Sequence, residues 1–597
     1  MKKKKFYLLI TFCSLLFVNL TAAEIYIRVN QVGYLSDEPK TALAFSKTDF
    51  SDKQFEIIHA ETGEKVWGPK GLGEQTGTWG DFKFHYELDF TDFKKGGQYK
   101  FKISGTDVVS QEFRIGEDVY NDYHEKVITF IQQQRCGYNP YYDEVCHQKD
   151  GRTMYGPMPD STYIDVSGGW HDAGDQLRYL MTSGNSVCRL LFSYRENKGK
   201  FQDKVNRYGQ KIPNEIPDVL DEAKWGLDWM LKMHPAPDQL FHQVADDRDH
   251  IGFKYPHLDT ADYGWGKGEY RVAYYASGTP QGLGKYQNTS TGIANLAGRY
   301  AAAMAMAYDI WKHDLKDPES AEVFKKAGLE VYEMGLKQPG CQEGTPHLAP
   351  YRYYEITWAD DMEWGAAELY KITKDEKYRK DAIRFSKKIK TTSWMGADTA
   401  RHYEYYPFMN MGHYALWEIG DKKIKRQMVN YYKENIEAVK KRADQNAYGV
   451  GHPFIWCSNN LASAFITQCL LYQKMTGDDQ YYELMQNHRD WLLGRNPWGS
   501  SQITGFPKYG QYPEYPHIPP TELTGDCVPG GINDGPVYAS IFNMLKGVQL
   551  SRPDKYADFQ SGICVYHDDI MDYSTNEPTL DGSAETHFFF SSFANEK

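Results

Sequence analysis

The hydrophobic pattern of this chain changes once, near residue 118, and that change limits the folds open to it. From Ile25 to about Ile115, short runs alternate apolar and polar residues between Gly, Asp and Pro turns, as in Thr41-Ala-Leu-Ala-Phe45. Alternation with period two at this spacing predicts a small β-sandwich. After Asp118, apolar residues recur at intervals of three and four, which predicts a large helical domain.

The helical part alternates periodic segments with long irregular ones. We expect helices at 123–134, 217–233, 292–311, 320–336, 360–373, 461–475 and 480–493. The Gly-, Pro- and Tyr-rich segments 235–291 and 497–536 exceed ordinary loop lengths, and such loops are often functional. The sequence therefore predicts a β module in front of a helical domain whose loops build a site.

The first 23 residues have the order of a secretory signal. Four lysines after Met1 precede an apolar run from Phe6 to Leu20, and Thr21-Ala22-Ala23 supplies small residues for cleavage. The run is shorter than the roughly 20 residues of a membrane-spanning helix. We predict a signal peptide at 1–23 and export to the periplasm or the outside of the cell, with no membrane span.

Composition narrows the choice of partner. The formal net charge is -12, and no basic run follows the first residues, which argues against nucleic acid or an anionic membrane as a partner. Aromatic residues make up 15% of the chain, and exposed rings stack well on the apolar faces of sugars. We expect a polysaccharide or oligosaccharide substrate, no organic cofactor, and a monomer.

The segment Asp165-Val-Ser-Gly-Gly-Trp-His-Asp-Ala-Gly-Asp175 concentrates groups suited to catalysis. Asp172 and Asp175 stand three residues apart on a glycine-rich stretch that a substrate can approach closely. Two such carboxylates could hold and deprotonate a water, and Trp170 offers a ring for stacking. A calcium loop or a solvated turn would use the same residue types.

A second acidic cluster, Tyr566-His-Asp-Asp-Ile-Met-Asp-Tyr573-Ser-Thr-Asn-Glu577, lies near the C-terminus. A carboxyl held there against Tyr573 would stay protonated near neutral pH, because desolvation disfavours its charged form. One acid poised as a base and another as an acid are what glycosidic bond hydrolysis requires. A solvated acidic turn remains the alternative for this segment taken alone.

Three more segments carry a resemblance to a known family: Arg28-Val-Asn-Gln-Val-Gly-Tyr34, Asn214 to Trp229, and Trp491-Leu-Leu-Gly-Arg-Asn-Pro497 followed by Thr504-Gly-Phe506. Together and in this order they resemble the glycoside hydrolases of family nine, in the branch with an N-terminal immunoglobulin-like domain. The resemblance implies an immunoglobulin-like β-sandwich at 24–116 and an all-α (α/α)6 barrel catalytic domain at 117–597.

The same resemblance implies roles for individual residues. Asp175 matches the catalytic base, Asp172 its partner in holding the attacking water, and Glu577 the acid that protonates the leaving oxygen. Asp568 matches a supporting aspartate, and His517 a substrate-binding histidine. The family inverts the anomeric carbon, which requires roughly 6.5–9.5 Å between acid and base. We predict that spacing between Glu577 and Asp175.

Two positions depart from the family pattern. Pro519 stands where the family usually places an arginine two residues after the histidine, so one contact to a sugar hydroxyl is missing or is supplied by another residue. Ser583 replaces an expected asparagine within Asp581-Gly-Ser-Ala-Glu585. These changes question the substrate more than the chemistry.

Cys136, Cys146, His147 and His171 offer two sulfurs and two imidazoles, a set that suits tetrahedral zinc. A Cys136–Cys146 disulfide is the alternative in an exported protein. The family resemblance implies zinc at such positions, in a structural role beside Asp172 and Asp175.

Further ligands follow only from the resemblance. Family members often carry calcium, and Asp360, Asp361 and Glu363 could supply its oxygen ligands, although solvated acids or substrate contacts fit that stretch as well. The candidate substrate-binding residues, for which core packing is the alternative, are Trp170, Trp358, Trp364, His402, Tyr403, Trp456 and Tyr573.

These observations leave three functional hypotheses. The leading one is an exported inverting endo-β-1,4-glucanase acting on cellulose-like or decorated glucans such as xyloglucan or mixed-linkage glucan. The second is an exo-acting relative, a β-glucosidase, cellobiohydrolase or glucosaminidase. The third, a non-catalytic glycan-binding protein, has no use for a matched acid and base.

Overall fold

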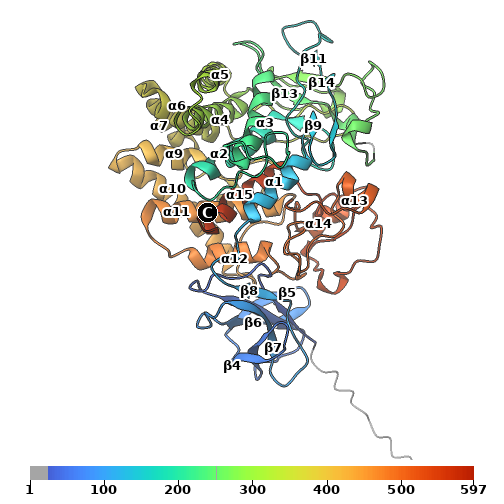
Figure 1. Cartoon of the computed structure of the whole chain (residues 1–597), viewed down its shortest axis with the longest axis vertical. Coiled ribbons are helices and arrows are strands. Elements are labelled where there is room, and N and C mark those ends of the chain that lie inside the picture. The colour runs from blue at the N-terminus through green and yellow to red at the C-terminus, as the bar shows by residue number, and fades with distance from the viewer. Residues whose placement is uncertain (1–23, 251, 398, 597) are drawn as a thin grey trace, which may run out of the picture.

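The computed structural model describes residues 24–250, 252–397 and 399–596, which form a small β domain below a large helical domain (Figure 1). The predicted signal peptide lies outside the described residues. Within those ranges, no helix combines the length and the apolar character needed to cross a bilayer.

Residues 24–116, all of them described, fold into a sandwich of two four-stranded antiparallel sheets, with strand orders β1-β2-β6-β5 and β4-β3-β7-β8. The strands are β1 (Ile25–Arg28), β2 (Thr41–Ser46), β3 (Gln54–His59), β4 (Lys65–Gly71), β5 (Gln75–Trp79), β6 (Phe82–Asp89), β7 (Gly97–Ile103) and β8 (Phe113–Ile115). Alternate residues such as Tyr99, Phe101 and Ile103 are buried between the sheets. The predicted β-sandwich is confirmed.

In the described part of the helical domain, six helices are buried over most of their surface: α2 (Leu180–Glu196), α4 (Ala294–His313), α6 (Ala359–Thr373), α9 (Met411–Ile419), α11 (Ser458–Thr476) and α15 (Leu580–Phe593). Helices without an exposed polar face lie inside a domain. α2 packs on α4, α4 on α6 and α6 on α9, while α15 packs on both α11 and α2, and the outer helix α10 (Lys422–Ala443) bridges α9 and α11. The six buried helices form the inner ring of an (α/α)6 barrel.

The outer helices are amphipathic, and each packs its apolar stripe on the inner ring. They are α1 (Tyr123–Gln133), α3 (Asp218–Lys232), α5 (Pro318–Lys337), α7 (Glu376–Ile389), α10 (Lys422–Ala443) and α12 (Tyr482–Leu492). Shorter helices are α8 (Trp394–Ala397), α13 (Pro519–Thr524) and α14 (Ala539–Met544), with 3₁₀ turns at Asp247–Asp249, Pro256–Leu258, Gly284–Tyr286 and Ala557–Phe559.

The long segments between the helices hold short strands. β11 (Arg152–Met154), β14 (Val272–Tyr275), β13 (Phe241–Val244) and β12 (Arg178–Tyr179) form one sheet in that order, and two small pairs are β9 (Tyr138–Asn139) with β10 (Glu144–Val145) and β15 (Val537–Tyr538) with β16 (Cys564–Val565). The expected loop 235–291 therefore contributes two strands. The periodicity also missed α2, α7, α9, α10 and α15.

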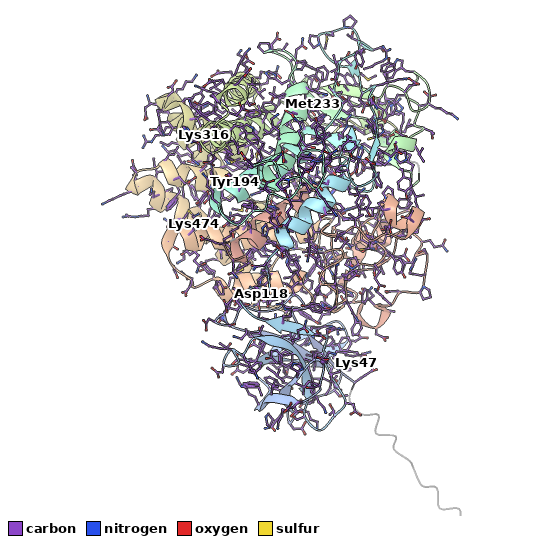
Figure 2. The ribbon with its side chains drawn as sticks, viewed as in Figure 1. Lys47, Asp118, Tyr194, Met233, Lys316 and Lys474 are labelled. Atoms are coloured by element: carbon purple, nitrogen blue, oxygen red, sulfur yellow. The ribbon has the colours of Figure 1, made fainter. Side chains whose placement is uncertain are left out.

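The two domains share a buried interface, near Asp118 as labelled in Figure 2. Glu38 of the β domain accepts two hydrogen bonds from the Arg489 guanidinium at 2.9 and 3.0 Å. The ring of Trp79 packs against Tyr448 and Trp491 with centroids 5.5 and 5.8 Å apart. Such contacts attach the β domain firmly to the barrel.

Candidate active site

A cavity of about 570 Å³ opens among the loops at one end of the barrel. Its walls come from chain segments distant in sequence, around residues 173–175, 349–353, 402–403, 456, 517, 534 and 571–579. A concave site of this size suits a small or extended ligand. It unites both acidic clusters found in the sequence.

The carboxylate of Asp175 lies at this cavity. Its Oδ1 accepts a hydrogen bond from the backbone N–H of Leu177 at 2.8 Å, and its Oδ2 lies 3.1 Å from Nε2 of His250. Burial lowers the pKa of His250, but the hydrogen bond and charge of Asp175 outweigh it and raise that pKa to about 9. The predicted base therefore faces a cationic imidazole.

Asp172 stands behind the cavity rather than in its wall. Its side chain is buried and accepts hydrogen bonds from the hydroxyls of Thr182 and Tyr353. Burial raises its pKa well above the usual value, and the nearby Asp175 and Asp581 carboxylates raise it further. Tyr353 itself lines the cavity, so Asp172 reaches the site through that phenol.

The predicted acid, Glu577, lies beside the base segment. Its Oε1 accepts the backbone N–H of Gly174 at 2.8 Å. Burial, followed by the charges of Asp534 and Asp175, raises the pKa of Glu577 well above the ordinary value of a glutamic acid. A Cβ at position 174 would come within 2.8 Å of Glu577 Oε1 and 2.4 Å of the His517 carbonyl oxygen. Glycine at 174 therefore permits the acid and base segments to meet.

His517 also lines the cavity, and its Nδ1–H donates to the carbonyl of Ile570 at 2.5 Å. Asp568 lies behind it and accepts the backbone N–H groups of Glu514 and Tyr515 at 3.0 and 2.9 Å. Asp568 thus holds the chain leading to His517 rather than facing a ligand.

One wall of the cavity is aromatic. The Trp456 ring stacks against Tyr573 at 5.6 Å and against His402 at 5.3 Å, and Tyr403 lies next to His402. All four residues line the cavity. Such a surface can stack on the apolar face of a sugar ring.

Comparison with known proteins identifies the family. The sequence model of glycosyl hydrolase family 9 matches residues 120–589. This chain belongs to glycosyl hydrolase family 9. The model of a cellulase N-terminal Ig-like domain matches residues 22–108 of the same family 9 chain, so the predicted resemblance and fold class are both confirmed.

Individual relatives of this family 9 hydrolase are distant. It is 26% identical over 545 residues to a xyloglucan-specific endo-β-1,4-glucanase of Bacteroides ovatus, with 85% of each chain covered. It is 25% identical over 593 residues to a cellodextrinase of Butyrivibrio fibrisolvens, with 92% of this chain and 96% of that one covered. A crystal structure of a metagenome-derived family 9 endoglucanase superposes with a TM-score of 0.76 at 24% identity, covering 96% of this chain and 99% of the other.

The four predicted zinc ligands of the family 9 hydrolase come together. The ligand atoms of Cys136, Cys146, His147 and His171 all lie within 4.8 Å of one another. The two sulfurs are 3.9 Å apart and both cysteines are free, so the Cys136–Cys146 disulfide considered above is absent. Two sulfurs bound at about 2.3 Å to one tetrahedral zinc would be about 3.8 Å apart. The donor set therefore fits zinc.

A neighbouring carboxylate orients one of the imidazoles. His147 Nε2 lies 3.1 Å from Asp259 Oδ2, which leaves Nδ1 facing Cys136 Sγ at 3.7 Å. A carboxylate behind a histidine is the usual outer partner of a zinc ligand. His171 immediately precedes Asp172, so the Cys/His group adjoins the segment that carries Asp172 and Asp175.

The possible calcium ligands do not gather in this way. Asp360, Asp361 and Glu363 are buried at the start of α6, where Glu363 pairs with His413 at 2.8 Å. In the part of the chain that the structure describes, the Cys/His group alone brings three or more such side chains close enough to hold a metal.

Three tryptophans predicted to contact substrate lie elsewhere, which corrects those predictions. Trp170 is fully buried and donates its indole N–H to Glu222 Oε1 at 2.7 Å. Trp364 is 1% exposed in the barrel core. Trp358 packs on Phe385 with centroids 5.8 Å apart. Core packing, the alternative noted for these rings, applies to Trp170 and Trp364, while Trp358 is partly buried at the edge of the core.

The two departures from the family pattern have local explanations. Pro519 is the first residue of α13, where its missing N–H costs nothing. Ser583 is buried in α15, donates to the Thr579 carbonyl at 2.6 Å and accepts the Ile532 N–H at 3.1 Å. Neither side chain reaches the carboxylates directly.

Sequence reasoning missed several residues of the cavity: Asp249, His250, Phe253, Tyr351, Tyr353 and Asp534. Most lie in irregular segments without periodicity. The run Asp246-Asp-Arg-Asp-His250 inside the long segment 235–291 was the one available signal, because charged residues concentrated in a long loop favour function.

Proposed function

We propose that this family 9 hydrolase is an exported inverting endo-β-1,4-glucanase that cleaves cellulose-like or decorated β-glucans. The observation that carries the proposal is the meeting of two unlike carboxyls in one cavity. The Glu577 carboxyl accepts the Gly174 N–H, and burial raises the pKa of Glu577. Asp175, the residue after Gly174, lies beside the cationic imidazole of His250. Environments that differ in this way suit an acid and a base.

In the proposed mechanism Glu577 protonates the glycosidic oxygen while Asp175 takes a proton from a water that attacks the anomeric carbon. Asp172, through Tyr353, fixes the position of that water. Inversion in one displacement needs about 6.5–9.5 Å between the acid and base carboxyls, and we predict this separation for Glu577 and Asp175. No covalent intermediate forms.

The aromatic wall supports a glucan as substrate. Trp456, stacked between His402 and Tyr573, offers a ring of fixed orientation beside the acid. The xyloglucan specificity of the Bacteroides ovatus relative favours decorated glucans. His517 would bind a sugar hydroxyl at the same end of the cavity.

Zinc is the metal we propose for the Cys/His group. Bound there, it would supply no reacting group and would fix the loop from Cys136 to His171, and with it the segment that carries Asp172 and Asp175. Four protein ligands close the coordination shell, as in structural zinc sites.

An exo-acting enzyme is the second candidate. Pro519 replaces the arginine that the family pattern expects, and one relative is a cellodextrinase. A shorter set of sugar contacts would favour chain ends over internal bonds.

The test is hydrolysis of carboxymethylcellulose, xyloglucan, mixed-linkage glucan and chito-oligosaccharides by the wild type and by Glu577→Gln, following viscosity, reducing ends and product sizes. A rapid fall in viscosity that the variant loses supports endo cleavage with Glu577 as acid. Release of short end products alone supports the exo enzyme. Unchanged activity in Glu577→Gln would remove Glu577 from the mechanism.

A further inference from the structure

Another carboxylate, that of Asp534, shares the cavity with Glu577 and Asp175. Its side chain comes from the irregular segment after α13, which the sequence motifs did not single out. Asp534 is 2% exposed, and a nearly buried carboxylate in a ligand cavity costs free energy unless it is paired or has a task.

Asp534 is the cross-strand neighbour of Glu577. Residues 532–535 run antiparallel to 575–579, with a bridge between Asn533 and Pro578. The Asp534 N–H donates to the Glu577 carbonyl at 2.8 Å, and the next N–H, of Gly535, donates to the Thr575 carbonyl at 3.1 Å. In this register Asp534 and Glu577 occupy paired positions on the two segments.

The Asp534 carboxylate also anchors the aromatic wall. The indole N–H of Trp456 donates to Asp534 Oδ2 at 2.6 Å. Trp456 is the central ring of the stack with His402 and Tyr573, so this hydrogen bond fixes the plane on which a sugar would stack. An N–H donor also favours the charged form of its acceptor.

We propose that Asp534 is a positioning residue: it holds the Trp456 indole in the aromatic wall and, as the ionised member of a carboxyl pair, keeps the remaining proton on Glu577. This inference rests on the proposed role of Glu577 as the acid. It links substrate stacking to the protonation of the group that must donate.

The electrostatics of the cavity agree in direction. After burial, the Asp534 charge is the largest influence that raises the pKa of Glu577. Burial raises the pKa of Asp534 as well, and the Trp456 hydrogen bond lowers it. Two interacting carboxyls lose their protons in two separate steps. Because the Trp456 indole N–H stabilises the charged form of Asp534, Asp534 loses its proton first and Glu577 second.

Other titratable groups act on the same pair. Those that influence Glu577 or Asp534 are Asp175, His250, Asp172, Asp572 and Asp581. The Tyr351 and Tyr573 phenols and the His402 and His517 imidazoles also line the cavity. They stay neutral near pH 7, because burial raises the pKa of the phenols and lowers that of the imidazoles.

The test is the pH profile of kcat/KM for Asp534→Asn on xyloglucan, or on whichever of the four glucans the wild type cleaves fastest. The asparagine oxygen can still accept the Trp456 N–H, so the wall is kept while the charge is removed. We expect the high-pH limb, which reports loss of the Glu577 proton, to move down by at least about one pH unit. Activity at low pH should be retained.

Asp581→Asn is the matched control. Asp581, on α15, is also a buried carboxylate, but it accepts a hydrogen bond from the Tyr403 hydroxyl at 2.7 Å and not from the Trp456 indole. A smaller shift there than in Asp534→Asn is expected. An unmoved limb in Asp534→Asn, an equal shift in both variants, or loss of activity at every pH with a native melting temperature would each overturn the proposal.

Trp456→Phe provides a second measurement that does not depend on the folding of Asp534→Asn. It keeps an aromatic ring but removes the indole N–H that donates to Asp534. The proton shared by the two carboxyls should then reside partly on Asp534 and partly on Glu577. We expect kcat to fall without a downward move of the high-pH limb, and a downward move would contradict the assignment. Activity of Glu577→Gln equal to wild type would instead defeat the proposed function itself.

Discussion

The two carboxyls that we propose as acid and base, Glu577 and Asp175, are positioned by different means. The segment that carries Asp175 follows a Cys/His group and is held by hydrogen bonds to several distant segments, such as the His171 N–H to the Gln134 carbonyl at 2.7 Å and the Leu580 N–H to the Asp172 carbonyl at 2.8 Å. The segment that carries Glu577 is built around Asp572, which accepts hydrogen bonds from Ser574 and Thr575, and pairs with 532–535. A metal bound to the Cys/His group, as proposed above, would add to the rigidity of the base side, whereas the acid side is held by hydrogen bonds within the protein.

The largest expected effects are on kcat, and they distinguish the role of Glu577 from the role of Asp175. Glu577→Gln and Asp175→Asn should each lower kcat on a glucan by about 10²–10⁴-fold, because each removes a proton-transfer group. An aryl glycoside, whose leaving group needs little protonation, should recover much of the activity in Glu577→Gln but not in Asp175→Asn. Steady-state rates on both substrates measure this, and equal recovery in both variants would reverse or abolish the two assignments.

The second prediction concerns the base side alone. Cys136→Ser should abolish zinc binding and lower the melting temperature by about 5–10 °C, because loss of a structural metal is among the larger single-site effects. Activity should fall with it as Asp172 and Asp175 lose their support. Metal content and calorimetry are the measurements.

Cys188→Ser is the control for that experiment, since Cys188 is a buried thiol whose sulfur lies 3.5 Å from the Arg299 carbonyl, away from the Cys/His group. It should keep its zinc. A full zinc content in Cys136→Ser would show that the group does not bind the metal as described.

The third prediction concerns the acid side. Asp568→Ala should lower kcat about tenfold, because the chain from Glu514 to His517 loses the carboxylate that accepts its N–H groups, and small misplacements of binding groups are costly. Zinc content should be unchanged. Reduced zinc in this variant would mean that the two sides are not independent.

The smallest effect is on stability. The folded state raises the pKa of Glu577, so Glu577 adds stability below its unfolded pKa of about 4.3 and loses it as the pH rises toward the folded value. Glu577→Gln carries no such cost. Its melting temperature should match that of the wild type near pH 4 and exceed it by about 1–3 °C near pH 7. A difference that is constant with pH would contradict a raised pKa.

The sequence predicted the framework better than the cavity. Period-two alternation located the sandwich, and spacing of three and four located α3, α4 and α5. α15 was missed because it is buried on all sides and buried polar residues such as Asp581 and Glu585 interrupt its apolar residues, which leaves no amphipathic period. Buried inner helices give weak periodic signals for this reason.

Within the site, the acids and the Cys/His group were visible as motifs, because each concentrates several chemical groups in a short segment. Tryptophans were less predictable. Trp456 lies in the cavity wall while Trp170 and Trp364 lie in the core, and all three stand within two residues of a polar side chain in the sequence. Asp534 could not be found, since its significance comes from pairing with a segment about forty residues later in the chain.

The anomeric form of the first product decides whether Asp175 and Glu577 act as an inverting pair. Proton NMR of a β-glucan digest, recorded within the first minutes before mutarotation, distinguishes the two anomers. The α-anomer should appear first, because Asp175 activates a water that attacks the face opposite the leaving group while Glu577 protonates the oxygen. Initial release of the β-anomer would mean two displacements through a covalent intermediate, and would contradict the assignment of Asp175 and Glu577 as an inverting pair.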